Sequence, residues 1–144
     1  MNLGPHTKRI GVALFCLSFL APAQSQERFR VRLATMPIEV ATRAEVTGFG
    51  SGSAVFDGTR LSISGQFAGM QGAATVARLH EGRVMGVRGL AIGELEVTLA
   101  PKGEISGEVQ LNAAQAESLR NGRLYIQIHS ASAPDGNLWG WLLP

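Results

Sequence analysis

Hydrophobic and polar residues alternate along most of this chain, most clearly near its C-terminal end. There the alternation places apolar side chains on one side of two runs, residues 124–129 and 138–142: Leu124, Ile126, Ile128, Leu138 and Leu142. A two-residue period is typical of β-strands with one face in a hydrophobic core. Between the runs, residues 134–136 (Pro-Asp-Gly) favour a turn, because proline fixes φ and glycine tolerates positive φ. The pattern predicts a C-terminal β-hairpin.

Shorter alternating runs upstream predict six further strands, at residues 27–33, 53–56, 60–67, 74–80, 90–99 and 104–111. Glycine-rich segments separate them, and we expect residues 48–52 (GFGSG) to form a turn or flexible segment. A short helix is predicted after Asn112, which can cap it together with Gln115, and Gly122 should end it. Many short strands with glycine turns and one short helix predict an all-β, antiparallel β-sandwich.

The first 23 residues are typical of a secretory signal peptide. Lys8 and Arg9 precede an apolar run, residues 10–20, that is too short to span a bilayer. Ala21-Pro22-Ala23 then offers a cleavage site before Gln24. We expect an exported protein, periplasmic or secreted, with one domain over residues 24–144 and no membrane span after cleavage. The alternative is an N-terminal membrane anchor.

Removal of this leader changes the charge balance. The 13 Lys and Arg residues of the chain include Lys8 and Arg9, which leaves 11 against 11 Asp and Glu residues. A near-neutral domain gives no electrostatic argument for binding to nucleic acid or to an anionic membrane. The single cysteine, Cys16, also lies in the leader, so the mature domain must be held by its core without disulfides.

Residues 61–142 resemble the CHRD (chordin-type) domain, which also occurs in secreted bacterial proteins. The matching segments follow the order of that family: LSISGQFAGM (61–70), ATVARLHEG (74–82), LEVTL (95–99), ISGEVQL (105–111), LNAAQAESLRNGRLYIQIHS (111–130) and APDGNLWGWL (133–142). The resemblance implies an immunoglobulin-like or superoxide-dismutase-like β-sandwich. It also implies a role in extracellular binding rather than a reaction.

The chain departs from the family pattern at two places. The His-Ile-His segment of the family is Arg78-Leu79-His80 here, and its Ile-Arg-Gly-Gln is Leu138-Trp139-Gly140-Trp141. The first departure bears on a possible metal site, because alternating histidines on a strand place both imidazoles on one face. In the mature chain such a site would use His80 and His129 together with carboxylates. The alternative is that both histidines are structural.

Nothing in the sequence predicts catalysis. Ser130 follows His129 directly, and neighbours in a strand point to opposite faces. The chain has no Gly-x-Ser-x-Gly nucleophile elbow. We therefore expect a non-enzymatic protein without a cofactor.

Trp139 and Trp141 are the candidate partner-binding residues. If Leu138 and Leu142 point inward, the two indoles lie together on the opposite face. Exposed, they would form a surface for a protein or carbohydrate partner. The alternative is that residues 81–89 or 34–52 cover them as a second small core. The predicted function is an extracytoplasmic binding or structural module of unknown partner and oligomeric state, with the metal-binding domain as alternative.

Overall fold

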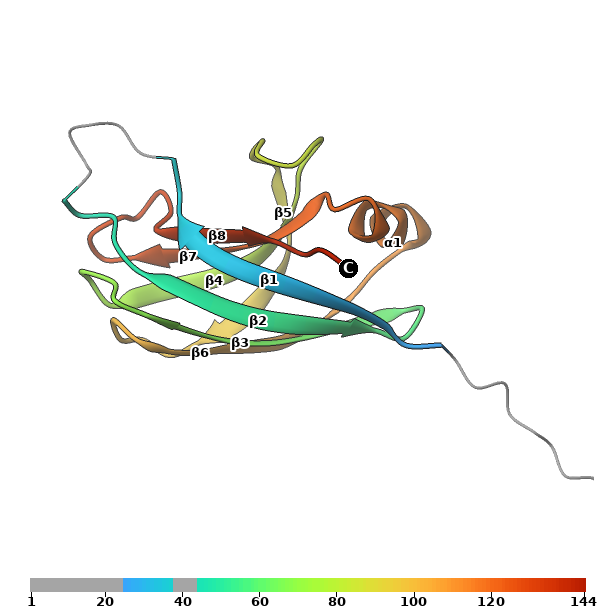
Figure 1. Cartoon of the computed structure of the whole chain (residues 1–144), viewed down its shortest axis with the longest axis horizontal. Helices are drawn as coiled ribbons and strands as arrows, with labels where there is room; N and C mark the ends of the chain where they lie inside the picture. Colours follow the sequence, from blue (N-terminus) through green and yellow to red (C-terminus); the bar gives the residue numbers. More distant parts are fainter. Residues whose placement is uncertain (1–24, 38–43) are drawn as a thin grey trace, which may run out of the picture.

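The computed structural model describes residues 25–37 and 44–144, so the predicted signal peptide lies outside the described residues. The described elements, in chain order, are β1 (Glu27–Thr35), β2 (Phe49–Phe56), β3 (Arg60–Ala68), β4 (Ala74–Glu81), β5 (Leu90–Val97), β6 (Gly103–Gln110), α1 (Ala113–Arg120), β7 (Leu124–Ser130) and β8 (Leu138–Trp141) (Figure 1). Within the described residues, no helix has the length and apolar character needed to cross a bilayer.

All neighbouring strands are antiparallel, and they close into a barrel in the order β1-β2-β3-β6-β5-β4-β7-β8. Two strands change partner along their length. Residues 27–33 of β1 pair with β2, whereas Ala34 and Thr35 pair with β8. Likewise, β5 pairs with β4 as far as Leu95 and with β6 at Glu96 and Val97. β1 and β5 therefore each belong to two sheets, and they join these sheets along both edges.

The all-β, antiparallel prediction is therefore confirmed, and the sandwich is replaced by a closed barrel. The immunoglobulin-like or superoxide-dismutase-like arrangement is not confirmed. Alternation reports which face of a strand is buried, but it carries no information about which strand lies beside it. The closure depends on the last two residues of β1 and of β5.

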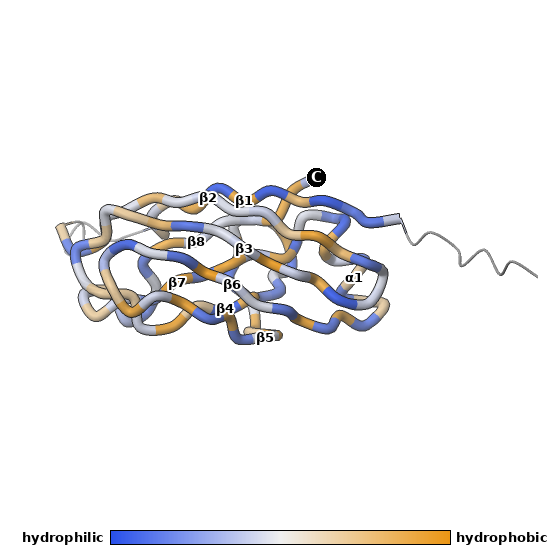
Figure 2. Tube along the Cα trace, turned by 90° about the horizontal axis from the view of Figure 1, so that it is seen from below, coloured by the Kyte–Doolittle hydropathy of each residue, from blue (hydrophilic) through white to orange (hydrophobic). Residues whose placement is uncertain are grey.

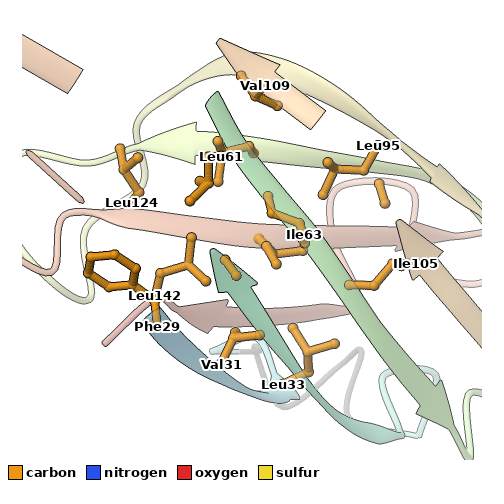
Figure 3. Packing of buried hydrophobic residues seen from close by; sticks show 14 of the residues in the cluster. Phe29, Val31, Leu33, Leu61, Ile63, Leu95, Ile105, Val109, Leu124 and Leu142 are labelled. Atoms are coloured by element: carbon orange, nitrogen blue, oxygen red, sulfur yellow. The ribbon is translucent and has the colours of Figure 1, made fainter. Parts of the chain in front are cut away.

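Inward side chains from all eight strands fill the barrel (Figure 3). Apolar and polar segments alternate along β1 in the hydropathy trace (Figure 2), where Phe29, Val31 and Leu33 are buried while the intervening arginines are exposed. An eight-stranded barrel has an interior just wide enough to be filled by side chains. Functional groups must accordingly be sought on the outside.

The C-terminal hairpin is confirmed. β7 pairs with β8 so that Ile128 lies opposite Leu138 and Ile126 lies opposite Gly140. All five residues predicted to face inward are fully buried: Leu124, Ile126, Ile128, Leu138 and Leu142. Gly136 in the connecting turn has φ +134°, a value that glycine adopts readily.

The short helix α1 is also confirmed, with both caps as predicted. The Asn112 side chain accepts a hydrogen bond from the Gln115 backbone at 2.9 Å, and the Gln115 side chain accepts one from the Asn112 backbone at 3.0 Å. Gly122 follows the helix with φ +66°. Leu119 of the helix is fully buried in the core cluster, so α1 packs onto the barrel.

Two local predictions are wrong. Residues 49–52 belong to β2 rather than to a turn, since Gly50 and Gly52 allow close approach of β3. A Cβ atom would lie 2.5 Å from the Gln66 carbonyl oxygen at Gly50 and 2.6 Å from that of Ser64 at Gly52. The predicted strand 90–99 ends at Val97, and Leu99 is 71% exposed in the following turn.

Candidate functional site

Four aromatic rings lie side by side on the outer face of β4, β7 and β8. The register places His80 opposite Tyr125 and Tyr125 opposite Trp141. His80 stacks on Tyr125 with ring centroids 4.9 Å apart, and Tyr125 lies 4.5 Å from Trp141. Trp139 is 5.7 Å from both Tyr125 and Trp141. We call these four residues the aromatic cluster; it joins one predicted metal ligand to both predicted binding residues.

The two ends of the loop 82–89 between β4 and β5 contact the aromatic cluster. The Gly89 backbone N–H donates to the Tyr125 hydroxyl at 3.0 Å, and His80 Nδ1 lies 3.1 Å from the Gly89 carbonyl oxygen. At Gly82 a Cβ atom would lie 2.9 Å from the Trp141 ring, so the loop starts in close contact with it. The aromatic cluster therefore supports the loop.

The aromatic cluster combines two of the alternatives for the indoles. Tyr125 and Gln127, which alternate with the inward residues of β7, are both buried on its outer side. Trp139 and Trp141 are only partly exposed. The two indoles thus contribute to a small outer core and still reach the surface.

The loop presents apolar side chains to solvent. Val84, Met85, Val87 and Leu90, the first residue of β5, are 57%, 54%, 46% and 83% exposed. Arg83 and Arg88 are also exposed, and residues 82–90 contain no acidic residue. In Figure 1 the loop stands clear of the barrel as the yellow-green segment next to β5. We call residues 83–90 the apolar loop.

A surface groove of about 560 Å³ continues from the apolar loop onto the barrel wall. Met85, Trp141 and Leu143 contribute to its lining, and Arg30 and Arg32 of β1 lie along it. Leu143 is 40% exposed. The apolar loop and this groove together form one apolar surface bordered by arginines.

A larger groove, about 840 Å³, is lined by residues of β1, β2, β3 and β6. Its lining carries charges of both signs, from Arg32, Lys102 and Glu104, together with Gln66 and the exposed Phe49. It is more polar than the groove beside Trp141.

His129 is part of a hydrogen-bond network within the β7–β8 turn. Its Nδ1 atom lies 2.8 Å from the Pro134 carbonyl oxygen, which accepts only from a protonated nitrogen. Its Nε2 atom lies 3.1 Å from the Gln127 side-chain nitrogen, which also donates to the Asp135 carbonyl oxygen at 3.2 Å. This assigns a neutral His129 with the proton on Nδ1, and both ring nitrogens are engaged.

His80 and His129 occupy different places in the register. His80 lies opposite Tyr125, four residues before His129, which corresponds to about 13 Å along the strand. The described residues contain no group of three or more His, Cys, Asp or Glu side chains that could hold a metal ion. Burial lowers the pKa of His80, the hydrogen bond to the Gly89 carbonyl oxygen opposes this, and the positive charges of Arg78 and Arg88 add to the lowering. A neutral His80 with its proton on Nδ1 fits the contact with Gly89.

Sequence reasoning missed a buried polar network at the other side of the same turn. Asn137 is fully buried, donates to the Thr47 carbonyl oxygen at 2.7 Å and accepts from the Ser130 hydroxyl at 2.8 Å. The Ser132 hydroxyl donates to the Glu45 carbonyl oxygen at 3.2 Å. These bonds join residues 45–47 to the turn across about ninety residues of sequence. In the sequence, Asn137 is only a polar residue between a turn and a strand. Nothing near it indicates a hydrogen bond to a residue as distant as Thr47.

Comparison with known proteins gives one match. The family model of the CHRD domain matches residues 29–142. No curated protein and no solved structure matches the chain.

Proposed function

Because the chain belongs to the CHRD domain family, we propose that it is an exported, non-enzymatic binding domain. We further propose that it binds through the apolar loop and the groove beside Trp141. Binding would then depend on noncovalent contacts of the side chains that the barrel leaves exposed to solvent, and not on a reactive group.

The exposure of the apolar loop carries this proposal. Burying apolar surface stabilises a complex by about 25 cal/mol per Å², so side chains left in solvent in one continuous patch favour association. Val84, Met85, Val87 and Leu90 are exposed within seven consecutive residues, and Met85 lines the same groove as the partly exposed Trp141. The loop is also held in place by Tyr125 and His80, which lowers the ordering cost of binding.

The test compares the wild-type protein with two variants on a solid support. Val84→Ser/Val87→Ser removes apolar surface from the loop, and Leu99→Ser removes a still more exposed apolar side chain from the β5–β6 turn. Each is incubated with extracts of the secreted and membrane material of the source organism. Material retained by the wild type and by Leu99→Ser, but not by the loop variant, supports the proposal. Equal retention by all three, or retention by none, contradicts it.

Export has its own test. The proposal rests on Lys8, Arg9, the apolar residues 10–20 and the Ala21-Pro22-Ala23 site. Intact-mass measurement of the protein recovered outside the cytoplasm should give a chain that begins at Gln24. A full-length chain retained in the cytoplasm would contradict export.

Metal binding by His80 and His129 stays a second hypothesis with less support, because both ring nitrogens of His129 already have hydrogen-bond partners. Calorimetric titration with Cu²⁺ or Zn²⁺ separates the two functions. We expect no saturable heat at micromolar metal, and saturable binding that disappears in both His80→Ala and His129→Ala would establish the metal site.

A further inference from the structure

We propose that the partner of the apolar loop is the surface of an anionic lipid bilayer, into which the loop inserts. This inference rests on the proposed binding surface and names what it binds. It starts from three features of that surface: a projecting apolar tip, a border of arginines and an indole at its base.

The first feature is the shape and chemistry of the tip. The apolar loop stands clear of the barrel (Figure 1), and its four large apolar side chains are each between 46% and 83% exposed. A projecting loop has no concavity of its own to receive a partner side chain. A bilayer admits apolar side chains without a preformed pocket, because its acyl boundary rearranges around them.

The second feature is the charge around the tip. Arg83 and Arg88 flank its centre, and Arg30 and Arg32 lie along the adjoining groove. Two acidic residues adjoin the tip: Glu81, which lies opposite Leu90 and accepts from the Ser118 hydroxyl, and Asp135, whose backbone carbonyl accepts from Arg88 at 3.4 Å. Each arginine near an anionic membrane surface strengthens binding about fivefold.

The near-neutral total charge of the domain conceals a local excess of cations. Arg83 and Arg88 lie in the apolar loop and Arg30 and Arg32 lie along its groove, whereas Glu81 and Asp135 are the adjoining acidic residues. The cations around the apolar loop therefore outnumber the adjoining carboxylates, although the charges of the mature chain cancel. A sum over the whole chain does not reveal this local distribution.

The third feature is Trp141. Its partly exposed ring lines the groove between Met85 and Leu143. Indoles are favoured at the boundary between acyl chains and headgroups, where one end of the ring is apolar and the other is wet. With the tip inserted, Trp141 would lie at that boundary.

Tryptophan emission and co-sedimentation with vesicles test the proposal directly on the mature protein. The vesicles are phosphatidylcholine alone and phosphatidylcholine mixed with phosphatidylglycerol. We expect sedimentation and a blue shift of emission only with the mixed vesicles, and weaker binding as salt is raised.

Three variants locate the contact. Arg83→Ser should weaken binding about fivefold, since it removes one cation from the border. Val84→Ser/Val87→Ser should weaken it by about tenfold or more, because two inserted side chains are lost. Leu99→Ser/Lys102→Ser makes the same kinds of change in the exposed β5–β6 turn and should leave binding unchanged. Circular dichroism confirms that each variant is folded.

The outcomes are distinct. No binding of the folded wild type to anionic vesicles overturns the inference, and so does binding that the loop variant and the turn variant weaken equally. If vesicles are not bound but a protein is still captured in a loop-dependent way, the bilayer inference fails and the proposed binding surface stands. If neither is bound, both fail.

Discussion

Two connections at opposite ends of β7 are built in opposite ways. The turn between β7 and β8 has a buried Ala133 and an interior of hydrogen-bonded polar groups, with Ser130 and Asn137 fully buried. The loop between β4 and β5 keeps its polar contacts at its ends and leaves its apolar side chains in solvent. A turn of the first kind contributes to the stability of the fold. A loop of the second kind contributes little to stability and is suited to binding.

Asn137→Ala should have the largest effect on stability. It leaves the Thr47 carbonyl oxygen and the Ser130 hydroxyl without their partner in a buried site. An unsatisfied buried polar group costs about 1–3 kcal/mol, so we expect a loss of at least that size in the free energy of unfolding, measured by urea denaturation. Ser64→Ala, at an exposed position of β3, is the matched control and should change it by about 0.5 kcal/mol or less.

Tyr125→Phe should have an intermediate effect. It keeps the ring between His80 and Trp141 but removes the hydroxyl that accepts from the Gly89 N–H. The expected loss is about 0.5–1.5 kcal/mol. Hydrogen exchange should show faster exchange of the Gly89 amide, with the amides of β2 and β3 unchanged. If Gly89 exchanges as in the wild type, the hydroxyl does not hold the loop.

His80 should make stability depend on pH. Its folded pKa is lowered below the usual 6.5 by burial, so near pH 6 the unfolded chain binds more protons than the folded one. The contribution of His80 is present above pH 6.5 and is lost as pH falls through the lowered folded value. His80→Asn keeps a donor near Gly89 but does not titrate there, so its free energy of unfolding should vary less between neutral pH and the acidic side. An unchanged slope would contradict a neutral, buried His80.

Val84→Ser/Val87→Ser should have the smallest effect on stability, about 0.5 kcal/mol or less per site, because both side chains are largely in solvent. The same change is expected to abolish retention of a partner. Thermal unfolding together with the binding assay measures both. A marked fall in the melting temperature would show that the side chains of the apolar loop stabilise the fold, as those of the β7–β8 turn do. The two connections would then not differ in their contribution to stability.

Local signals predicted local structure well. Asn112, Gln115 and Gly122 act on the backbone within a few residues, so the caps of α1 could be read directly. The inward residues of the C-terminal hairpin follow from a two-residue period that any buried strand face imposes. The strand at residues 49–52 was not predicted, because Gly50 allows close approach of a neighbouring strand rather than forming a turn. A glycine in a turn and a glycine within a strand cannot be told apart from the sequence alone.

The candidate site could be predicted only in part. Trp139 and Trp141 were identified, and their position on the outer face follows from the alternation. Their contact with His80 and Tyr125 depends on the pairing of β4 with β7, and the cover over Tyr125 depends on a loop from elsewhere in the chain. For residues 81–89 the sequence predicts only a glycine-rich connection or a cover over the two indoles. The sequence of residues 83–90 alone does not indicate that their apolar side chains remain exposed to solvent.

The order of residues along the chain was enough to predict the family, the all-β antiparallel class, the helix with its caps, and the inward face of most strands. These depend on the order of residues within short segments. Tertiary structure alone decided the closure of the barrel, the burial of Tyr125 and Gln127, and the gathering of arginines beside an exposed apolar loop. Those features arise from contacts between segments far apart in the chain, which a periodic pattern of apolar and polar residues does not encode.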